Sequence, residues 1–231
     1  MTLQCSAFSD ADPQPLHLVE EITHRVVNEY TEAICALGLA ASASRNINVQ
    51  LALTSAASRL RAQAEAHRAL QAPLVDGPMD LADYIGQLCG CLARAPFAEG
   101  DVRLMVRADE VWLRADRCWR VGLIVAELVR NAARHGLAGR PGAIWVEVTQ
   151  ASGRIDCSVC DDGGGAQMVR TGRGRRLARA LAAELGGSID WTFAPGGCCV
   201  RLEFPADVAW EREPSGGSTQ LFARPTARRF D

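Results

Sequence analysis

The 231-residue chain contains no lysine, so all 25 of its basic residues are arginine. We attribute this bias to genome composition rather than to chemistry. The formal net charge is only −2, which argues against nucleic-acid binding as the main task, because such proteins carry a marked basic excess. The hydrophobic content of 48% is ordinary for a globular protein, and the length suits one medium domain and a smaller one.

The chain also lacks a long apolar run. No segment reaches the roughly 18 uninterrupted apolar residues of a membrane-spanning helix. The N-terminal residues 1–5 lack the basic region and apolar core that mark a secretory signal. These two absences predict a soluble cytoplasmic protein with no membrane partner.

Nine cysteines raise the question of a metal site or of disulfides. Cys157 and Cys160 have the two-residue gap of zinc ligands, but they lie in an expected strand, where positions three apart face opposite sides. The adjacent pair Cys198 and Cys199 has the same difficulty. Because cytosolic thiols are normally reduced and small cysteines pack well, we expect buried or incidental thiols and no zinc site.

Residues 15–71 show a helical periodicity that is interrupted at 42–46. The positions of one stripe recur every three or four residues on both sides of this break, with one gap of seven on each side. They are Val19, Ile22, Val26, Ala33, Leu37 and Ala40 before it, and Val49, Leu53, Ala56, Leu60, His67 and Leu70 after it. A hairpin of two helices has too small a core to be stable alone, so we expect two copies to form a four-helix bundle, and hence a homodimer.

From Met79 onward the pattern alternates between helices and strands. Helices are expected near 79–94, 117–136 and 174–186, and strands near 101–107, 111–115, 143–150, 154–160, 188–194 and 197–204. This mixed order predicts an α+β fold in which helices cover one face of a sheet. Pro73, Gly77 and Pro78 mark a linker. Residues 206–231 are expected to form a flexible tail, because they are rich in proline, glycine and serine.

Two polar segments of this second region predict a nucleotide pocket. On a helix, Glu127, Asn131 and His135 recur every four residues and share one polar face. The amide oxygen of Asn131 is a suitable hard ligand for Mg²⁺. The carboxylate of Asp161 can accept a hydrogen bond from an adenine amino group, and the glycines after it let backbone approach a ligand. For His135, a cation at a helix end is the alternative interpretation.

These segments resemble those of bacterial sensor histidine kinases, in particular the HisKA_2 and HWE-like class, whose phosphoacceptor helix reads His-Arg-Val-Lys-Asn. The corresponding segment is Glu21-Ile22-Thr23-His24-Arg25-Val26-Val27-Asn28. The resemblance implies a dimerising phosphotransfer hairpin at residues 15–72. It also implies a two-layer α/β sandwich of the GHKL, or Bergerat, type at residues 78–205, which binds ATP.

The resemblance assigns roles to individual residues. His24 is the expected phosphoacceptor, Asn131 binds Mg²⁺, and Glu127 orients that ligand or a metal-bound water. Asp161 contacts adenine. The remaining expected nucleotide-binding residues are His135, Gly163, Gly165, Gly172 and Gly174. Gly172 and Gly174 enter a helix N-terminus, where backbone amides favour phosphate.

The helical periodicity independently places His24 in solvent. It lies two residues from both Ile22 and Val26, about 200° around the helix from the apolar stripe. An exposed neutral imidazole can act as a nucleophile near pH 7 and can be reached by two successive partners. Either Glu21 or Asn28 could orient its other ring nitrogen.

The resemblance makes Asp161, Gly163 and Gly165 the first glycine box of the family and Gly172-Arg173-Gly174 the second. The chain departs from the family pattern near the second glycine box. Only six residues, 166–171, separate the two glycine boxes, so the lid over ATP is short. Arg175 and Arg176 stand where family members usually have glycine and leucine, and Val27 replaces the lysine after the histidine. The arginines of this region either grip the triphosphate or form a solvated helix face. They are Arg170, Arg173, Arg175, Arg176 and Arg179.

The resemblance thus implies an ATP-dependent protein histidine kinase. It would autophosphorylate His24 from Mg-ATP and pass the phosphoryl group to a response-regulator receiver domain, with a separate sensor protein supplying the signal. Such a transfer depends mainly on positioning and charge neutralisation. The alternative is a histidine phosphotransferase or scaffold whose sandwich no longer binds ATP. Retention of both Asn131 and Asp161 favours the kinase.

Overall fold

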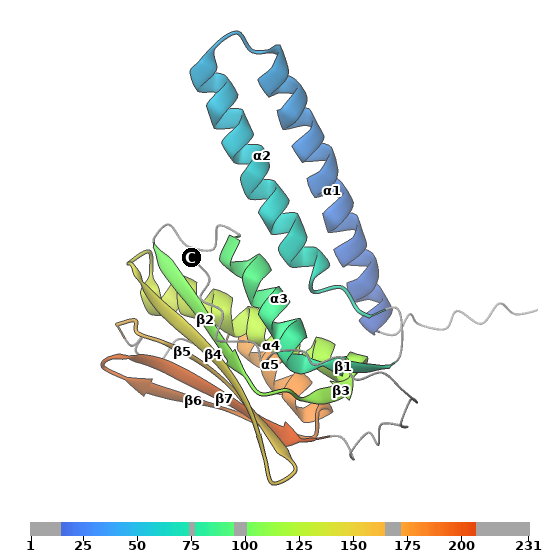
Figure 1. The fold of residues 1–231 in the computed structure, drawn as a ribbon, viewed down its shortest axis with the longest axis vertical. Helices are drawn as coiled ribbons and strands as arrows, with labels where there is room; N and C mark the ends of the chain where they lie inside the picture. Colours follow the sequence, from blue (N-terminus) through green and yellow to red (C-terminus); the bar gives the residue numbers. More distant parts are fainter. Residues whose placement is uncertain (1–14, 74–76, 95–100, 165–171, 207–231) are drawn as a thin grey trace, which may run out of the picture.

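The structure is a computed structural model that describes residues 15–73, 77–94, 101–164 and 172–206, with the side chains of residues 15–24 excluded. Gly165, the expected lid at 166–171 and all but the first residue of the expected tail at 206–231 therefore lie outside the described residues. The described part consists of a helical hairpin and an α/β sandwich (Figure 1). The predicted α+β fold is confirmed.

The hairpin is formed by α1 (Pro15–Ala43) and α2 (Ile47–Arg68), which lie side by side (Figure 1). The side chain of Asn46 caps α2 by accepting a hydrogen bond of 2.9 Å from the amide of Asn48. This cap supplies an acceptor to one of the amides that a helix start leaves unpaired, which explains why the chain turns at the expected break.

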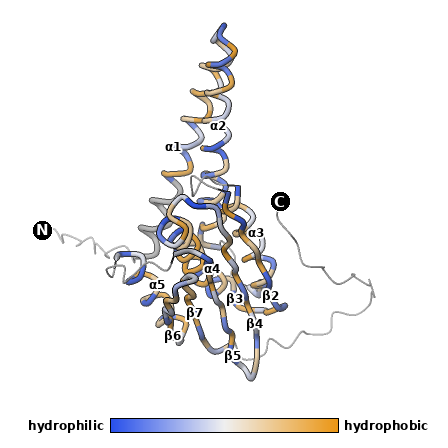
Figure 2. The backbone as a smooth tube through the Cα atoms, turned by 90° about the vertical axis from the view of Figure 1, so that its left-hand side faces the viewer, coloured by the Kyte–Doolittle hydropathy of each residue, from blue (hydrophilic) through white to orange (hydrophobic). Residues whose placement is uncertain are grey.

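The two helices do not cover all of their apolar side chains. Val27, Ala41, Ala57 and Ala64 are buried. Four large apolar side chains in the outer half of the hairpin are exposed instead, namely Leu39 (73%), Ile47 (62%), Val49 (43%) and Leu51 (63%). Figure 2 shows apolar positions along the whole hairpin, including the part that projects beyond the sandwich. Val49 is thus exposed in a single chain because α1 alone does not cover it, and its burial by a second hairpin stays a prediction.

The base of the hairpin packs on the sandwich, which the sequence pattern did not predict. Ala66 and Leu70 belong to the same buried cluster as the sandwich core. The indole nitrogen of Trp119 donates a hydrogen bond of 2.9 Å to the carbonyl of Leu70, and the hydroxyl of Tyr84 donates one of 3.1 Å to the carbonyl of Ala69. The end of α2 is thus held to the helices that follow, although Pro73 and Gly77 had been expected to mark a linker.

The sandwich has helices on one face of a five-stranded sheet (Figure 1). Its helices are α3 (Leu81–Arg94), α4 (Ala115–Asn131), the π-helix η1 (Ala132–Leu137) and α5 (Arg173–Glu184). The main sheet contains β2 (Val102–Ala108), β4 (Gly142–Ala151), β5 (Arg154–Asp161), β7 (Gly197–Pro205) and β6 (Ser188–Ala194), in this spatial order. Among the neighbouring pairs of this sheet, β2 and β4 are parallel and the other three pairs are antiparallel. A separate ribbon pairs β1 (Pro78–Asp80) with β3 (Trp112–Arg114).

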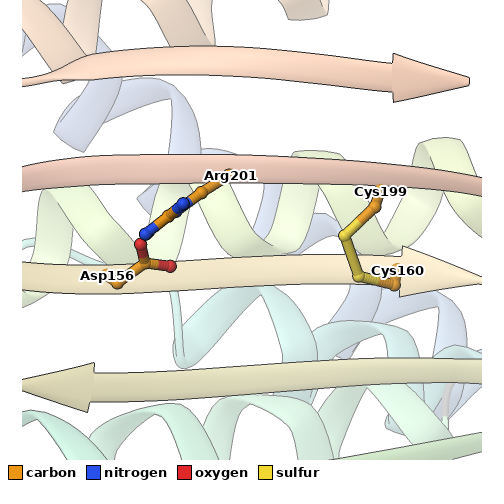
Figure 3. Close-up of a disulfide and its surroundings, with 4 residues drawn as sticks. All are labelled: Asp156, Cys160, Cys199 and Arg201. Carbon is orange, nitrogen blue, oxygen red and sulfur yellow. A yellow bond between two sulfur atoms is a disulfide. The ribbon is translucent and has the colours of Figure 1, made fainter.

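The core lies between this sheet and its helices, because alternate strand positions point to one face. The central strands contribute the buried residues Ile144, Val146, Val148, Ile155, Cys157, Val159, Val200, Leu202 and Phe204. Burying such a side chain is worth about 1.5–3 kcal/mol. The opposite face is more polar, as the ion pair between Arg201 and Asp156 illustrates (Figure 3).

That opposite face also carries a disulfide between Cys160 and Cys199 (Figure 3). The expectation that all the cysteines are reduced thiols is therefore wrong for this pair. The sequence argument compared cysteines within one segment, whereas the register of β5 and β7 places Cys160 directly opposite Cys199. Cys157, by contrast, is a buried free thiol on the core face.

Two features are absent from the described residues. No group of three or more His, Cys, Asp or Glu side chains within them is arranged to hold a metal ion. Nor is any helix in this part of the chain long and apolar enough to span a membrane.

Candidate functional site

A pocket with a cavity volume of about 120 Å³ lies between α4, η1, the start of α5 and the sheet. The residues of the expected site that line it are Glu127, Asn131, His135, Asp161, Gly172 and Gly174. Gly163 lies against Asp161 at its edge. Gly165 lies outside the described residues. His24 lies on α1, and its side chain is not described, so its expected exposure stays a prediction. Segments nearly fifty residues apart in sequence thus form one pocket.

Glu127 and Asn131 lie one turn apart on α4 and contact each other. The amide nitrogen of Asn131 donates a hydrogen bond of 3.0 Å to Oε1 of Glu127. This use of the nitrogen leaves the amide oxygen of Asn131 as the atom suited to a hard cation such as Mg²⁺. The pair therefore fits the metal-binding role that the sequence predicted.

The carboxylate of Glu127 also lies against the first turn of α5. A Cβ added to Gly174 would come within 1.7 Å of Oε1 of Glu127, so only glycine fits there without displacing that carboxylate. The residue before α5, Gly172, is its N-cap and provides no side-chain cap. The start of α5 therefore receives no side-chain cap from Gly172 and is suited to an anion, as other helix N-termini are.

The end of α4 differs from the regular helix that the sequence predicted. After Asn131 the helix continues as the π-helix η1. Its C-cap is Ala138, which has a left-handed conformation (φ 51°). Wider π-turns often occur at functional sites. Here the turn carries Gly136 onto Asp161, where a Cβ on Gly136 would lie 2.5 Å from Oδ1 of the carboxylate.

Asp161 is buried at the end of β5, with 8% of its surface exposed. Its carboxylate accepts hydrogen bonds from the backbone amides of Gly163 (3.0 Å) and Cys198. Desolvation by burial nevertheless raises the pKa of Asp161 above its usual value, and the nearby charge of Asp162 acts in the same direction. The pocket thus contains a buried hydrogen-bond acceptor that donors of the right shape can reach.

The next residue, Asp162, has a different task. Its Oδ1 accepts a hydrogen bond of 2.8 Å from the amide of Ala143, which fixes the start of β4 against the end of β5. The sequence reads Asp161-Asp162, and the structure separates the two carboxylates into a pocket residue and a structural residue.

Sequence reasoning missed several pocket residues. Trp191, Phe193, Cys198 and Val200 line the sheet side of the pocket. Arg175, for which the sequence left open a phosphate contact or a solvated helix face, lines its α5 side. Gly136 also lines the pocket, although the sequence of residues 127–136 assigned it no role. The alternation of β6 and β7 could have identified the inward positions, but only the register of these strands with β5 shows that they lie beside Asp161.

Two family models match the chain, one in each part. The model described as "Histidine kinase" matches residues 21–95. The model described as "Histidine kinase-, DNA gyrase B-, and HSP90-like ATPase" matches residues 119–208. The first covers the hairpin from before His24, and the second covers the pocket from α4 to the end of β7.

Two curated relatives are also kinases by name. Blue-light-activated histidine kinase 2 of Erythrobacter litoralis is 24% identical over 196 residues, which cover 80% of this chain and 56% of that protein. Sensor histidine kinase PdtaS of Mycolicibacterium smegmatis is 27% identical over 196 residues, covering 81% of this chain and 39% of that protein. The chain therefore spans only about half or less of the length of these relatives.

Solved structures show the same fold. The histidine kinase domain of the blue-light activated histidine kinase from Erythrobacter litoralis EL346 matches with a TM-score of 0.56 and 22% identity, over 78% of this chain and 94% of that one. A longer structure of that kinase matches with a TM-score of 0.51 and 19% identity, over 88% of this chain and 62% of that one. A hairpin followed by a sandwich is thus a known arrangement.

The close approach of backbone at the pocket edge yields a stability prediction. A Cβ on Gly163 would lie 2.2 Å from the carbonyl oxygen of Gly136, so Gly163→Ala should lower the free energy of unfolding by about 1–3 kcal/mol because backbone must move. Gly86→Ala is the matched control, since nothing lies within 4 Å of the new methyl group in helix α3. It should raise the stability by about 0.5–1 kcal/mol. Urea denaturation measures both, and equal stabilities for the two variants would contradict the packing described.

Proposed function

Because the chain belongs to the HisKA_2/HWE-type sensor histidine kinases with a GHKL ATPase domain, we propose that it transfers the γ-phosphoryl group of Mg-ATP to His24. A receiver-domain aspartate of a response regulator then accepts the group. The observation that carries this proposal is the pocket that gathers Glu127, Asn131 and Asp161 beside the first turn of α5.

Each pocket residue has a task in this reaction. The carboxylate of Asp161 accepts a hydrogen bond from the adenine amino group, since it is the buried acceptor of the pocket. The amides at the start of α5 bind phosphate oxygens. The amide oxygen of Asn131 holds Mg²⁺, which would neutralise phosphate charge, and Glu127 fixes the orientation of Asn131 through its hydrogen bond.

The position of α1 supports His24 as the acceptor. His24 is the tenth of the 29 residues of α1 (Pro15–Ala43), and the N-terminal end of this helix lies beside the sandwich (Figure 1). The outer end, near residues 44–46, projects away from it. An acceptor near the base therefore has a shorter path to the nucleotide than one near the tip.

The phosphotransferase alternative requires a pocket that no longer binds ATP. The paired Glu127 and Asn131 side chains, the buried Asp161 and the glycine at position 174 that accommodates Glu127 all favour a working pocket instead. We therefore retain the kinase as the proposed function.

The acceptor assignment predicts that His24→Ala abolishes acid-labile, base-stable labelling from γ-labelled Mg-ATP while ATP affinity stays nearly unchanged. His67 provides the matched control, because it is half-buried on α2, stacks 5.5 Å from the ring of Tyr30, and has a pKa lowered by burial and by the charge of Arg130. His67→Ala should keep the label. Retention of label by His24→Ala, with loss in His67→Ala, would move the acceptor to α2.

Asp161→Asn should have opposite effects on the stability of the fold at neutral pH and on the affinity for nucleotide. Since burial raises the pKa of Asp161 in the folded protein, its ionised form opposes folding at neutral pH. This cost disappears below the unfolded pKa, where the group is protonated in both states. The variant should therefore gain stability at about pH 7 and lose that gain near about pH 3. ATP and ADP should both bind more weakly, since a hydrogen bond to a charged acceptor is worth about 1.5–3 kcal/mol.

Urea denaturation at the two pH values and calorimetric titration with nucleotide measure these effects. A variant that is less stable than the wild type by the same amount at both pH values would show that the hydrogen bonds of Asp161, rather than its desolvation, dominate.

We further propose a homodimer formed through the hairpin. Leu39, Ile47 and Leu51 expose apolar surface at its outer half, and a second hairpin would cover it as a four-helix bundle. The full chain should sediment as a dimer at micromolar concentration, and Leu51→Arg should make it a monomer. Leu177→Arg is the matched control, because Leu177 is 49% exposed on α5, outside the hairpin. A wild-type monomer, or equal loss of dimer in both variants, would contradict the bundle.

A further inference from the structure

Two arginines of the basic cluster near the second glycine box, Arg175 and Arg179, lie over aromatic rings, and of these two only Arg175 also lines the pocket. The guanidinium carbon of Arg175 lies 5.5 Å from the ring centroid of Trp191 and 5.2 Å from that of Phe193. Arg175 is half-buried and lines the pocket, whereas Arg173 and Arg176 on the same helix are exposed and do not. Arg175 is therefore a pocket residue, whereas Arg173 and Arg176 belong to a solvated helix face.

The sheet explains why aromatic rings lie under this arginine. Trp191 pairs with Val200, which pairs with Val159, so these three residues form one row across β6, β7 and β5. Phe193 pairs with Cys198, which lies beside Asp161. Both rows face the pocket. The aromatic side chains therefore form the β6 side of its floor, two strands away from the buried carboxylate.

The position of Arg175 on α5 places its charge at the helix N-terminus, beside the expected phosphate site. It is the third residue of a helix whose N-cap is Gly172, so it belongs to the same first turn as Gly174. The aromatic faces attract the guanidinium and restrict its motion. An arginine that is held before a ligand arrives loses less conformational freedom on binding, and its fork of N–H donors matches phosphate oxygens.

We propose that Arg175 is a phosphate-binding residue of the nucleotide site and that Trp191 and Phe193 are positioning residues that hold its guanidinium in the pocket. The ligand class is the polyphosphate chain of a nucleoside di- or triphosphate. This inference rests on the proposed function for the identity of the nucleotide. It adds a side-chain cation to the backbone amides of α5 and to the Asn131 metal ligand.

Calorimetric titration of the full chain with adenosine, AMP, ADP and ATP tests the proposal. In Arg175→Ala the dissociation constant for ATP should rise about tenfold or more, as expected for the loss of a charge-assisted hydrogen bond. The constant for adenosine should change less than about twofold, since adenosine carries no phosphate. Arg176→Ala is the matched control, because it removes the same charge from the next, exposed position. It should leave all four constants nearly unchanged.

A double-mutant cycle tests the positioning role. Trp191→Leu alone should weaken ATP binding, and adding it to Arg175→Ala should produce little further loss, because the ring acts through the arginine. Arg175→Lys should recover part of the affinity, since it restores the charge without the planar fork. Phe193→Leu, at a position 39% exposed, provides a second ring variant that is less prone to unfold the core. Circular dichroism melts confirm that each variant folds.

The outcomes separate this inference from the proposed function. Equal weakening of adenosine and ATP in Arg175→Ala would overturn it by showing that this wall contacts the base. Unchanged affinities in Arg175→Ala, with normal ATP binding by the wild type, would also overturn it. Inorganic tripolyphosphate serves as a probe that needs neither adenine nor His24. If the wild type binds it and Arg175→Ala does not, the phosphate role stands even where His24 labelling fails. Equal binding by both proteins would refute it.

Discussion

The close packing of backbone around the carboxylate of Asp161 is the constraint on which the site depends. Gly136 and Gly163 approach this side chain and each other so closely that a Cβ at either position would overlap its neighbours. A Cβ on Gly197 would likewise lie 1.8 Å from the carbonyl oxygen of Asp161, and Gly197 has a φ of 139° that disfavours other residues. Three separate segments, η1, the end of β5 and the start of β7, are thereby fixed to one point.

This constraint determines where α4 places its polar face. With η1 fixed against Asp161, Asn131 and Glu127 lie one and two turns back along the same rigid helix. Glu127 then contacts the first turn of α5 at Gly174, and the pocket is closed on that side by Arg175 over Trp191. The buried acceptor, the amide oxygen and the N-terminus of α5 keep their spacing because α4 and η1 carry Asn131 and contact both Asp161 and the first turn of α5.

The same helix connects the pocket to the hairpin. Trp119, near the start of α4, donates a hydrogen bond to the carbonyl of Leu70, just after α2. Asn131, at the end of α4, lines the pocket. Ala66 and Leu70 are buried in the sandwich core. The base of the hairpin is therefore an integral part of the sandwich, and a fragment that begins after residue 72 would remove Leu70 from the core and leave the Trp119 indole without this acceptor.

Apart from the short strand β1, where a helix had been expected from Met79, the sequence by itself determined the element types and their order. The periods of 3.6 and 2 predicted the hairpin and the alternating helices and strands, and the spacing of Glu127, Asn131 and His135 predicted one helical face, since these are local properties of the backbone. Tertiary structure decided the rest. Strand register and the close approach of distant segments determine four features. These are the Cys160–Cys199 disulfide, the aromatic rings under Arg175, the π-turn after Asn131 and the different roles of Asp161 and Asp162. Local periodicity carries no information about these contacts, because they form only when the sheet brings residues far apart in sequence to the same place.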